Sequence, residues 1–236
     1  MVMRNKQVWT SQRAEPSAVS RLIRESLSQG FRQAYRHTGL DPEKYLRHVR
    51  RMHGLPIESW KDIHGLDETL LQQPAASIIG ASSKIAALEG LGLGLGGFST
   101  ILPDMGILAA ITLRMMQKLS LIHGFEYSTE EEVAGLWLAV ASAAGIDLAR
   151  EYLEKQAAEK IVPRIIDRVA VKLGAEVAEK WTGRLLPVVS SGIGGAVNYC
   201  FVRSWGRRAQ QHFIERHRQM RGLSFVAGQP LLPASS

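Results

Sequence analysis

The chain has 236 residues, of which 45% are hydrophobic, and this favours a folded protein with one sizeable core over a disordered chain. Its formal net charge of +7 is uneven: residues 1–64 hold 12 lysines and arginines against 6 acidic residues, residues 65–202 hold 11 against 15, and residues 203–221 hold 6 against 1. The single cysteine, Cys200, excludes an intramolecular disulfide, and no apolar run follows the basic N-terminal residues as a secretory signal requires. We therefore expect a cytoplasmic protein.

The first elements are predicted as helices between disordered ends. Residues 1–17 and 223–236 are polar or aperiodic, so 18–222 is predicted to form a single helical domain. Within it, apolar residues at helical spacing predict a helix from Val19 to Tyr35, and Asp41-Pro42-Glu43 predicts the start of a second helix. Ser59 and Asp62 predict the cap of a short third helix.

A helix opening at Gln73-Pro74 is predicted to run to Leu88, where a glycine-rich apolar segment begins. The glycines of this segment are Gly90, Gly92, Gly94, Gly96 and Gly97. Each glycine costs about 1 kcal/mol in a helix interior, so a self-supporting helix here is disfavoured by roughly 5 kcal/mol. Close packing against a neighbour is the most economical explanation of such a segment.

Pro103-Asp104 predicts the start of the next helix, with Asp104 as its N-cap and Gly124 as its stop. The sequence from Ser128 to Glu131 predicts a capping box that opens a long alanine-rich helix, running past Gly145, and Pro163 is expected to kink or split this region. Two buried stripes are predicted beyond it: Ile165, Ile166, Val169, Leu173, Val177 and Trp181, and then Val202, Trp205, Ala209 and Phe213.

A second uncharged segment, Leu185 to Val202, contains Pro187 and three glycines, Gly192, Gly194 and Gly195. We predict that Gly90–Gly97 packs its backbone against Pro187–Asn198 at the centre of the domain. No convincing strand is found, so the expected fold is all-α: a single multi-helix globular domain with two buried Gly/Pro-rich apolar segments.

The sequence contains no metal-binding or serine-hydrolase motif, and its one match to a cofactor-binding motif does not follow a predicted strand. The run from Gly92 to Gly97 satisfies G-x-G-x-x-G, but the preceding residues predict a helix, whereas dinucleotide binding needs a strand there. The pairs His48/His53 and His212/His217 are five residues apart, which places the two rings on different helix faces. With no Cys pair and no Gly-x-Ser-x-Gly, we predict no metal and no cofactor.

Four polar residues lie in apolar surroundings and are the candidate site residues. Asp104 and Asp147 are weak candidates for an acid or base, and Arg114 and Asn198 are predicted to belong to a buried polar cluster. Each also has a structural alternative: Asp104 suits a helix cap, Asp147 suits the point where its helix leaves the core, and Asn198 suits a partner for backbone groups near the glycines.

Three motifs can be compared with known families: the glycine run into Leu102-Pro103-Asp104, the helix from Ile107 to His123 with Gly124-Phe125, and the later Leu186-Pro187-Val188-Val189 leading to Gly192-Ile193-Gly194-Gly195. Together they resemble the EcsC protein family. The resemblance covers roughly residues 75–215. It implies a mostly helical bacterial protein, often regarded as membrane-associated, whose activity is generally unassigned.

The favoured hypothesis is therefore a helical protein that associates peripherally with an anionic membrane surface or a membrane protein complex. Arg203, Arg207 and Arg208 would attract anionic lipid, and the apolar glycine segments would supply contact. An enzyme acting on an apolar or lipid-like substrate through a buried aspartate is the alternative. Nucleic acid is disfavoured as a partner despite the basic charge, because no reading motif is present.

Overall fold

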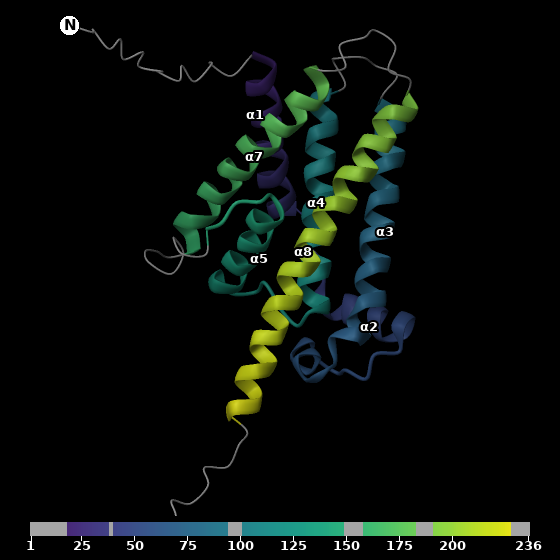
Figure 1. The fold of residues 1–236 in the computed structure, drawn as a ribbon, viewed down its shortest axis with the longest axis vertical. Coiled ribbons are helices and arrows are strands. Elements are labelled where there is room, and N and C mark those ends of the chain that lie inside the picture. Colours follow the sequence, from purple (N-terminus) through teal and green to yellow (C-terminus); the bar gives the residue numbers. More distant parts are fainter. Residues whose placement is uncertain (1–17, 38–39, 94–100, 149–157, 183–190, 228–236) are drawn as a thin grey trace, which may run out of the picture.

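A computed structural model describes residues 18–37, 40–93, 101–148, 158–182 and 191–227. The elements in these ranges are all helices, as expected, and they pack as one all-α bundle (Figure 1). They are α1 (Ala18–His37), α2 (Pro42–His53), the short 3-10 helix η1 (Trp60–Gly65), α3 (Glu68–Leu93), α4 (Ile101–Ile122), α5 (Glu130–Ala143), α7 (Ala158–Thr182) and α8 (Ser191–Ala227).

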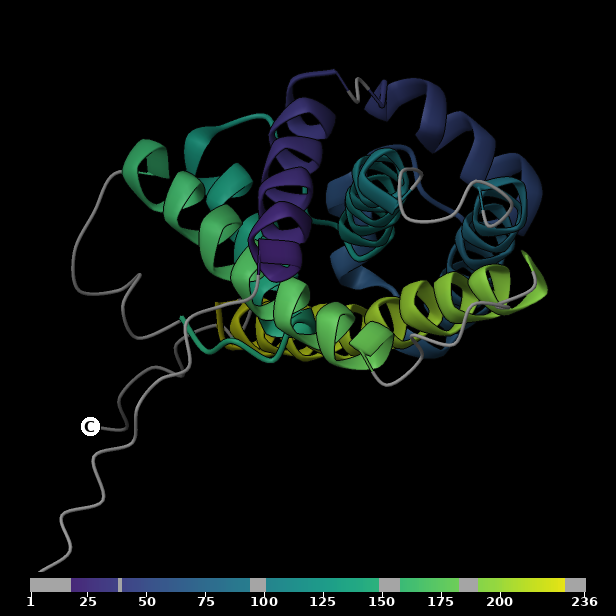
Figure 2. The same cartoon turned by 90° about the horizontal axis from the view of Figure 1, so that it is seen from above.

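Helix α4 is the central element of the bundle. Viewed along its axis, it lies between α1 and α3, with α8 crossing below (Figure 2). Its residues Leu113, Met115 and Leu119 are fully buried. The segment Met105–Ile122 is also long and apolar enough to cross a bilayer, but 67% of it is buried inside the protein, as is usual for a core helix.

The two predicted apolar stripes are found in the core. On α7, Ile165, Ile166, Val169 and Leu173 are buried, and on α8 the whole stripe of Val202, Trp205, Ala209 and Phe213 is fully buried. The side chains of Val177 and Trp181 lie outside the described residues. Helix α1 contributes Ile23, Leu27, Phe31 and Ala34 to the same core. The 3.6-residue periodicity therefore identified the inward faces correctly.

Several predicted caps are confirmed by hydrogen bonds. The Asp41 carboxylate accepts a bond from the Lys44 backbone N–H at 3.0 Å, and the Asp62 carboxylate accepts one from the Ser59 N–H at 2.7 Å. Gly124 has φ +85°, in the left-handed region that favours glycine, at the end of α4. These caps satisfy backbone groups that a helix end leaves without intrahelical partners.

Helix starts differ from the prediction in three places. Helix α3 begins at Glu68 and not at Pro74, since Asp67 caps it by accepting the Thr69 N–H at 2.9 Å. Helix α4 is already helical at Ile101, so Asp104 lies inside it and is not its N-cap. The capping box before α5 pairs Thr129 with Glu132, one residue later than expected.

Helix ends differ as well. Helix α3 continues through Gly90 to Leu93, where the glycine count predicted a break. Helix α5 stops at Ala143, because Gly145 adopts φ +72° and the Ile146 N–H donates to the Ala141 carbonyl at 2.9 Å, which is a Schellman motif. The prediction that this helix continues past Gly145 is therefore wrong.

Candidate functional site

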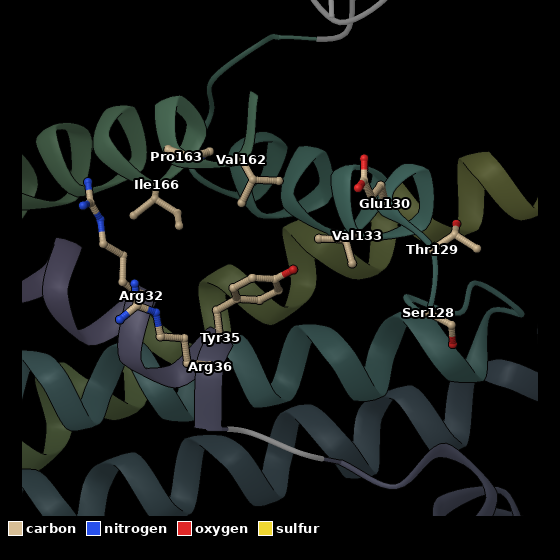
Figure 3. A pocket seen from close by; sticks show the side chains of 10 residues that line it. All are labelled: Arg32, Tyr35, Arg36, Ser128, Thr129, Glu130, Val133, Val162, Pro163 and Ile166. Atoms are coloured by element: carbon tan, nitrogen blue, oxygen red, sulfur yellow. The ribbon is translucent and has the colours of Figure 1, made fainter. Parts of the chain in front are cut away.

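A cleft of about 480 Å³ opens between α1, α5 and α7. Its lining residues are Arg32, Tyr35 and Arg36 from α1, Ser128, Thr129, Glu130 and Val133 at the start of α5, and Val162, Pro163 and Ile166 from α7 (Figure 3). We call this the α1–α5–α7 cleft. Its volume lies within the roughly 300–1,000 Å³ that is usual for small-molecule sites.

The cleft is polar at its two sides and apolar between them. Figure 3 shows Arg32 and Arg36 on the side away from Ser128, Thr129 and Glu130, with the Tyr35 ring between the two groups. The Arg32 guanidinium donates to the Asp167 carboxylate at 2.8 Å, and Ser28 donates to the same carboxylate oxygen at 3.0 Å. These bonds orient Arg32 toward Asp167 on α7.

Tyr35 forms the middle of the cleft. Its ring packs edge-on against the buried Trp137, with ring centroids 6.0 Å apart, and the side chain is 41% exposed. Burial raises the pKa of its hydroxyl, and the nearby negative charge of Glu130 raises it further. The phenol therefore stays protonated at neutral pH and can donate a hydrogen bond to a ligand.

The four predicted polar site residues do not converge in the described structure. Arg114 is exposed on α4, so the prediction that it is buried is wrong. Asp147 is exposed just after the turn that ends α5, in agreement with the alternative that it marks where the helix leaves the core. Asn198 is buried at 6% exposure, as predicted. Asp104 is within α4, and its side chain lies outside the described residues. Arg114, Asp147 and Asn198 are not among the described residues that line the α1–α5–α7 cleft.

Among the glycines predicted to permit close packing, Gly195 lies at such a contact. A Cβ atom at Gly195 would lie 2.7 Å from the Ala87 carbonyl oxygen and 2.9 Å from Leu91 Cγ. Gly90 is buried in α3, Gly92 is also within α3, and Gly192 and Gly194 are within α8. Gly94, Gly96, Gly97 and Pro187 lie outside the described residues. The contact at Gly195 packs α3 against α8 and accounts for α3 remaining helical through Gly90. The prediction that this packing lies at the centre of the domain is wrong, because the end of α3 and the start of α8 lie at one end of the bundle (Figure 1).

The end of the bundle that contains these glycines also exposes apolar side chains. We call it the glycine end; it comprises the end of α3 and the starts of α4 and α8, which lie together at one end of the molecule in Figure 1. On α3, Ile85 is 51% exposed and Leu88 is 67% exposed, and on α4, Ile107 is 37% exposed. Lys84 is exposed beside them.

The arginines predicted to attract lipid lie farther along α8. The Arg203 guanidinium donates to the Tyr199 hydroxyl at 2.9 Å, and Arg208 stacks on Trp205 with its guanidinium carbon 5.9 Å from the ring centroid. Arg207 is exposed. It follows Ser191 by 16 residues, which at about 1.5 Å per residue places it about 24 Å along the helix from the glycine end.

A buried histidine cluster at the opposite end was missed by the sequence analysis. His217 is fully buried, and its ring nitrogens lie 3.2 Å from the Leu66 carbonyl oxygen and 3.4 Å from that of His123. Its ring centroid is 5.9 Å from that of His64. The three histidines come from η1, the end of α4, and α8. The spacing test compared residues within one helix, so it could not detect side chains that tertiary packing brings together.

Burial favours the neutral form of two rings in this cluster, those of His64 and His123. Burial lowers the pKa of His123 to about 4, and its Nδ1 lies 2.7 Å from the Leu119 carbonyl oxygen. Burial, followed by the charge of His217, lowers the pKa of His64. The His123 ring stacks on Phe213 with centroids 5.7 Å apart. In the described part of the chain, no three His, Cys, Asp or Glu side chains are placed to hold a metal.

Comparison with known proteins agrees with the resemblance drawn from the glycine and proline motifs. Protein EcsC of Bacillus subtilis (strain 168) is 27% identical to the chain over 158 residues, which are 65% of this chain and 66% of that relative. No solved structure matches. A family model for the EcsC protein family matches residues 3–217 and thus includes the N-terminal helices that the motifs did not cover. The chain belongs to the EcsC protein family.

Proposed function

We propose that this protein associates peripherally with the cytoplasmic face of an anionic membrane through its glycine end. The observation that carries the proposal is the exposure of Ile85 and Leu88 on α3 at that end of the bundle. Exposed apolar side chains that cluster at one end of a protein are typical of a contact surface. Moving the exposed parts of these two side chains out of water would favour membrane binding by roughly 1–2 kcal/mol for each side chain.

Two opposite charges flank the exposed apolar residues, since Lys84 and Glu89 are both exposed on α3. Lys84 precedes Ile85 on α3 and is exposed, so it would meet anionic headgroups when Leu88 enters the interface. Arg207 follows Gly206, which packs against Ile79, so it lies about 9 Å along α3 from the level of Ile85, and its charge is screened over roughly one Debye length, about 8 Å in physiological salt. We therefore assign the α8 arginines a weak steering role and not the direct contact that the sequence suggested.

Flotation with vesicles of phosphatidylcholine and phosphatidylglycerol tests the proposal. The full chain should float with these vesicles, and the double variant Ile85→Glu/Leu88→Glu should not. Met52→Glu is the matched control, because Met52 is 62% exposed on α2 at the other end of the molecule, and this variant should float like the parent. Flotation of the double variant, or no flotation of the parent, would refute membrane contact by the glycine end.

A triple arginine variant tests whether the membrane contacts the glycine end or the side of α8. Arg203→Ala/Arg207→Ala/Arg208→Ala should float nearly as well as the parent at physiological salt. If this variant fails to float while Ile85→Glu/Leu88→Glu floats normally, the side of α8 is the contact face and the proposed orientation is wrong.

A further inference from the structure

We propose that the α1–α5–α7 cleft binds a small amphiphile that carries one anionic group, a carboxylate or a phosphate, on an apolar chain. The anionic group would lie at Arg32 and Arg36, and the apolar chain would lie along the Tyr35 ring toward Val133. The proposal does not depend on membrane contact, because Ile85 and Leu88 do not line this cleft.

The arginine side of the cleft can receive an anion without rearrangement. Arg32 uses one Nη2 bond to Asp167, and a guanidinium has five N–H donors, so the bonds to described residues leave its Nε and Nη1 groups available to a ligand. Arg36 is exposed and makes no ion pair with any described residue. A carboxylate or phosphate between the two would accept charge-assisted bonds from both guanidinium groups.

The middle of the cleft offers an apolar surface. Val162 is 8% exposed and Ile166 is 3% exposed, so both belong to the core and present a rigid wall on the α7 side. The Tyr35 ring forms the opposite wall and is held in place by Trp137. An alkyl or aryl group between these walls would lose water contact on both faces, which favours an amphiphile over a free inorganic anion.

The α5 side of the cleft limits the ligand to one negative group. Glu130 lies close enough to Tyr35 for its charge to act on the phenol, and it makes no ion pair with a described residue. A second anionic group at the far end of the ligand would face this carboxylate and be repelled. The same charge sets the orientation, with the anionic head toward the arginines.

Calorimetric titration of the full chain with four single-chain probes tests the inference. Decanoate and decyl phosphate supply the two head classes, decanol removes the charge, and decylammonium reverses it. We expect decanoate or decyl phosphate to bind at least ~10-fold more tightly than decanol, and decylammonium not to bind. Whichever of the two anions binds more tightly identifies the chemical class of the ligand's head group. Equal binding of decanol and both anions, or tighter binding of decylammonium, would overturn the proposal.

Variants locate the binding in the cleft. Arg32→Gln/Arg36→Gln should weaken binding of the anionic probe at least ~10-fold, whereas Arg21→Gln, an exposed arginine elsewhere on α1, should leave it unchanged. Glu130→Gln should tighten binding, because it removes a repelling charge while leaving the first turn of α5 intact. Thermal melts of each variant check that it is folded. Unchanged affinity in the folded double variant, or weaker binding in Glu130→Gln, would overturn the placement or the orientation.

Discussion

Replacing Gly195 by alanine is the sharpest test of how the glycine end is packed. The added Cβ would lie 2.7 Å from the Ala87 carbonyl oxygen and 2.9 Å from Leu91 Cγ, and the first of these is a backbone atom that cannot rotate away. Helix α8 must therefore shift relative to α3. Overpacking of this kind costs about 1–3 kcal/mol, while alanine gains about 1 kcal/mol over glycine in a helix interior. The expected net effect is a loss of up to about 2 kcal/mol.

Gly80→Ala is the matched control for this substitution. Gly80 lies inside α3, and a Cβ there would meet nothing within 4 Å, so only the helix-propensity gain remains. This variant should be more stable than the parent by roughly 0.5–1 kcal/mol. The propensity gain is common to both variants, so the difference between them isolates the overpacking cost of about 1–3 kcal/mol.

Urea unfolding at 25 °C, followed by circular dichroism and fitted by linear extrapolation, measures both variants. Gly195→Leu extends the series, because a larger side chain at the same contact should destabilise the protein more than alanine does. If Gly195→Ala proved as stabilising as Gly80→Ala, the close approach of α3 and α8 would not exist in solution, and the reason given for the helicity of α3 through Gly90 would be lost.

Two further predictions concern the histidine cluster. The pKa of His123 is about 4 in the folded protein, whereas its ordinary value is 6.5. The stability that depends on its neutral ring is therefore complete above pH 6.5 and is lost as the pH falls toward 4, by up to about 3 kcal/mol. Burial also lowers the pKa values of His64 and His212, so both act in the same direction. Urea midpoints at pH 7.5 and pH 5 should show this loss, and His123→Asn should reduce it; an unchanged pH dependence in that variant would contradict the assignment. Phe213→Ala should cost about 3–5 kcal/mol, since the ring is fully buried against His123 and Phe125, and a cost below about 1 kcal/mol by the same unfolding assay would show that the cluster is loosely packed.

The sequence by itself determined the all-α class, the inward faces of α7 and α8, and the caps at Asp41 and Asp62. These features follow from local rules, because helical periodicity and capping involve residues only a few positions apart. Residue type also indicated that Gly195 would lie at a close contact, since glycines concentrated in an apolar sequence allow two helix backbones to approach each other closely.

Tertiary structure alone decided which residues meet. Asp147 and Arg114 lie in apolar stretches of sequence, yet both are exposed, because the Schellman turn at Gly145 ends α5 before Asp147 and the rotation of α4 turns Arg114 outward. His64, His123 and His217 are far apart in sequence and adjoin one another in space. The α1–α5–α7 cleft likewise joins three segments that no local pattern connects. Periodicity shows which face of a helix is buried, but the partner of that face depends on the packing of the whole bundle.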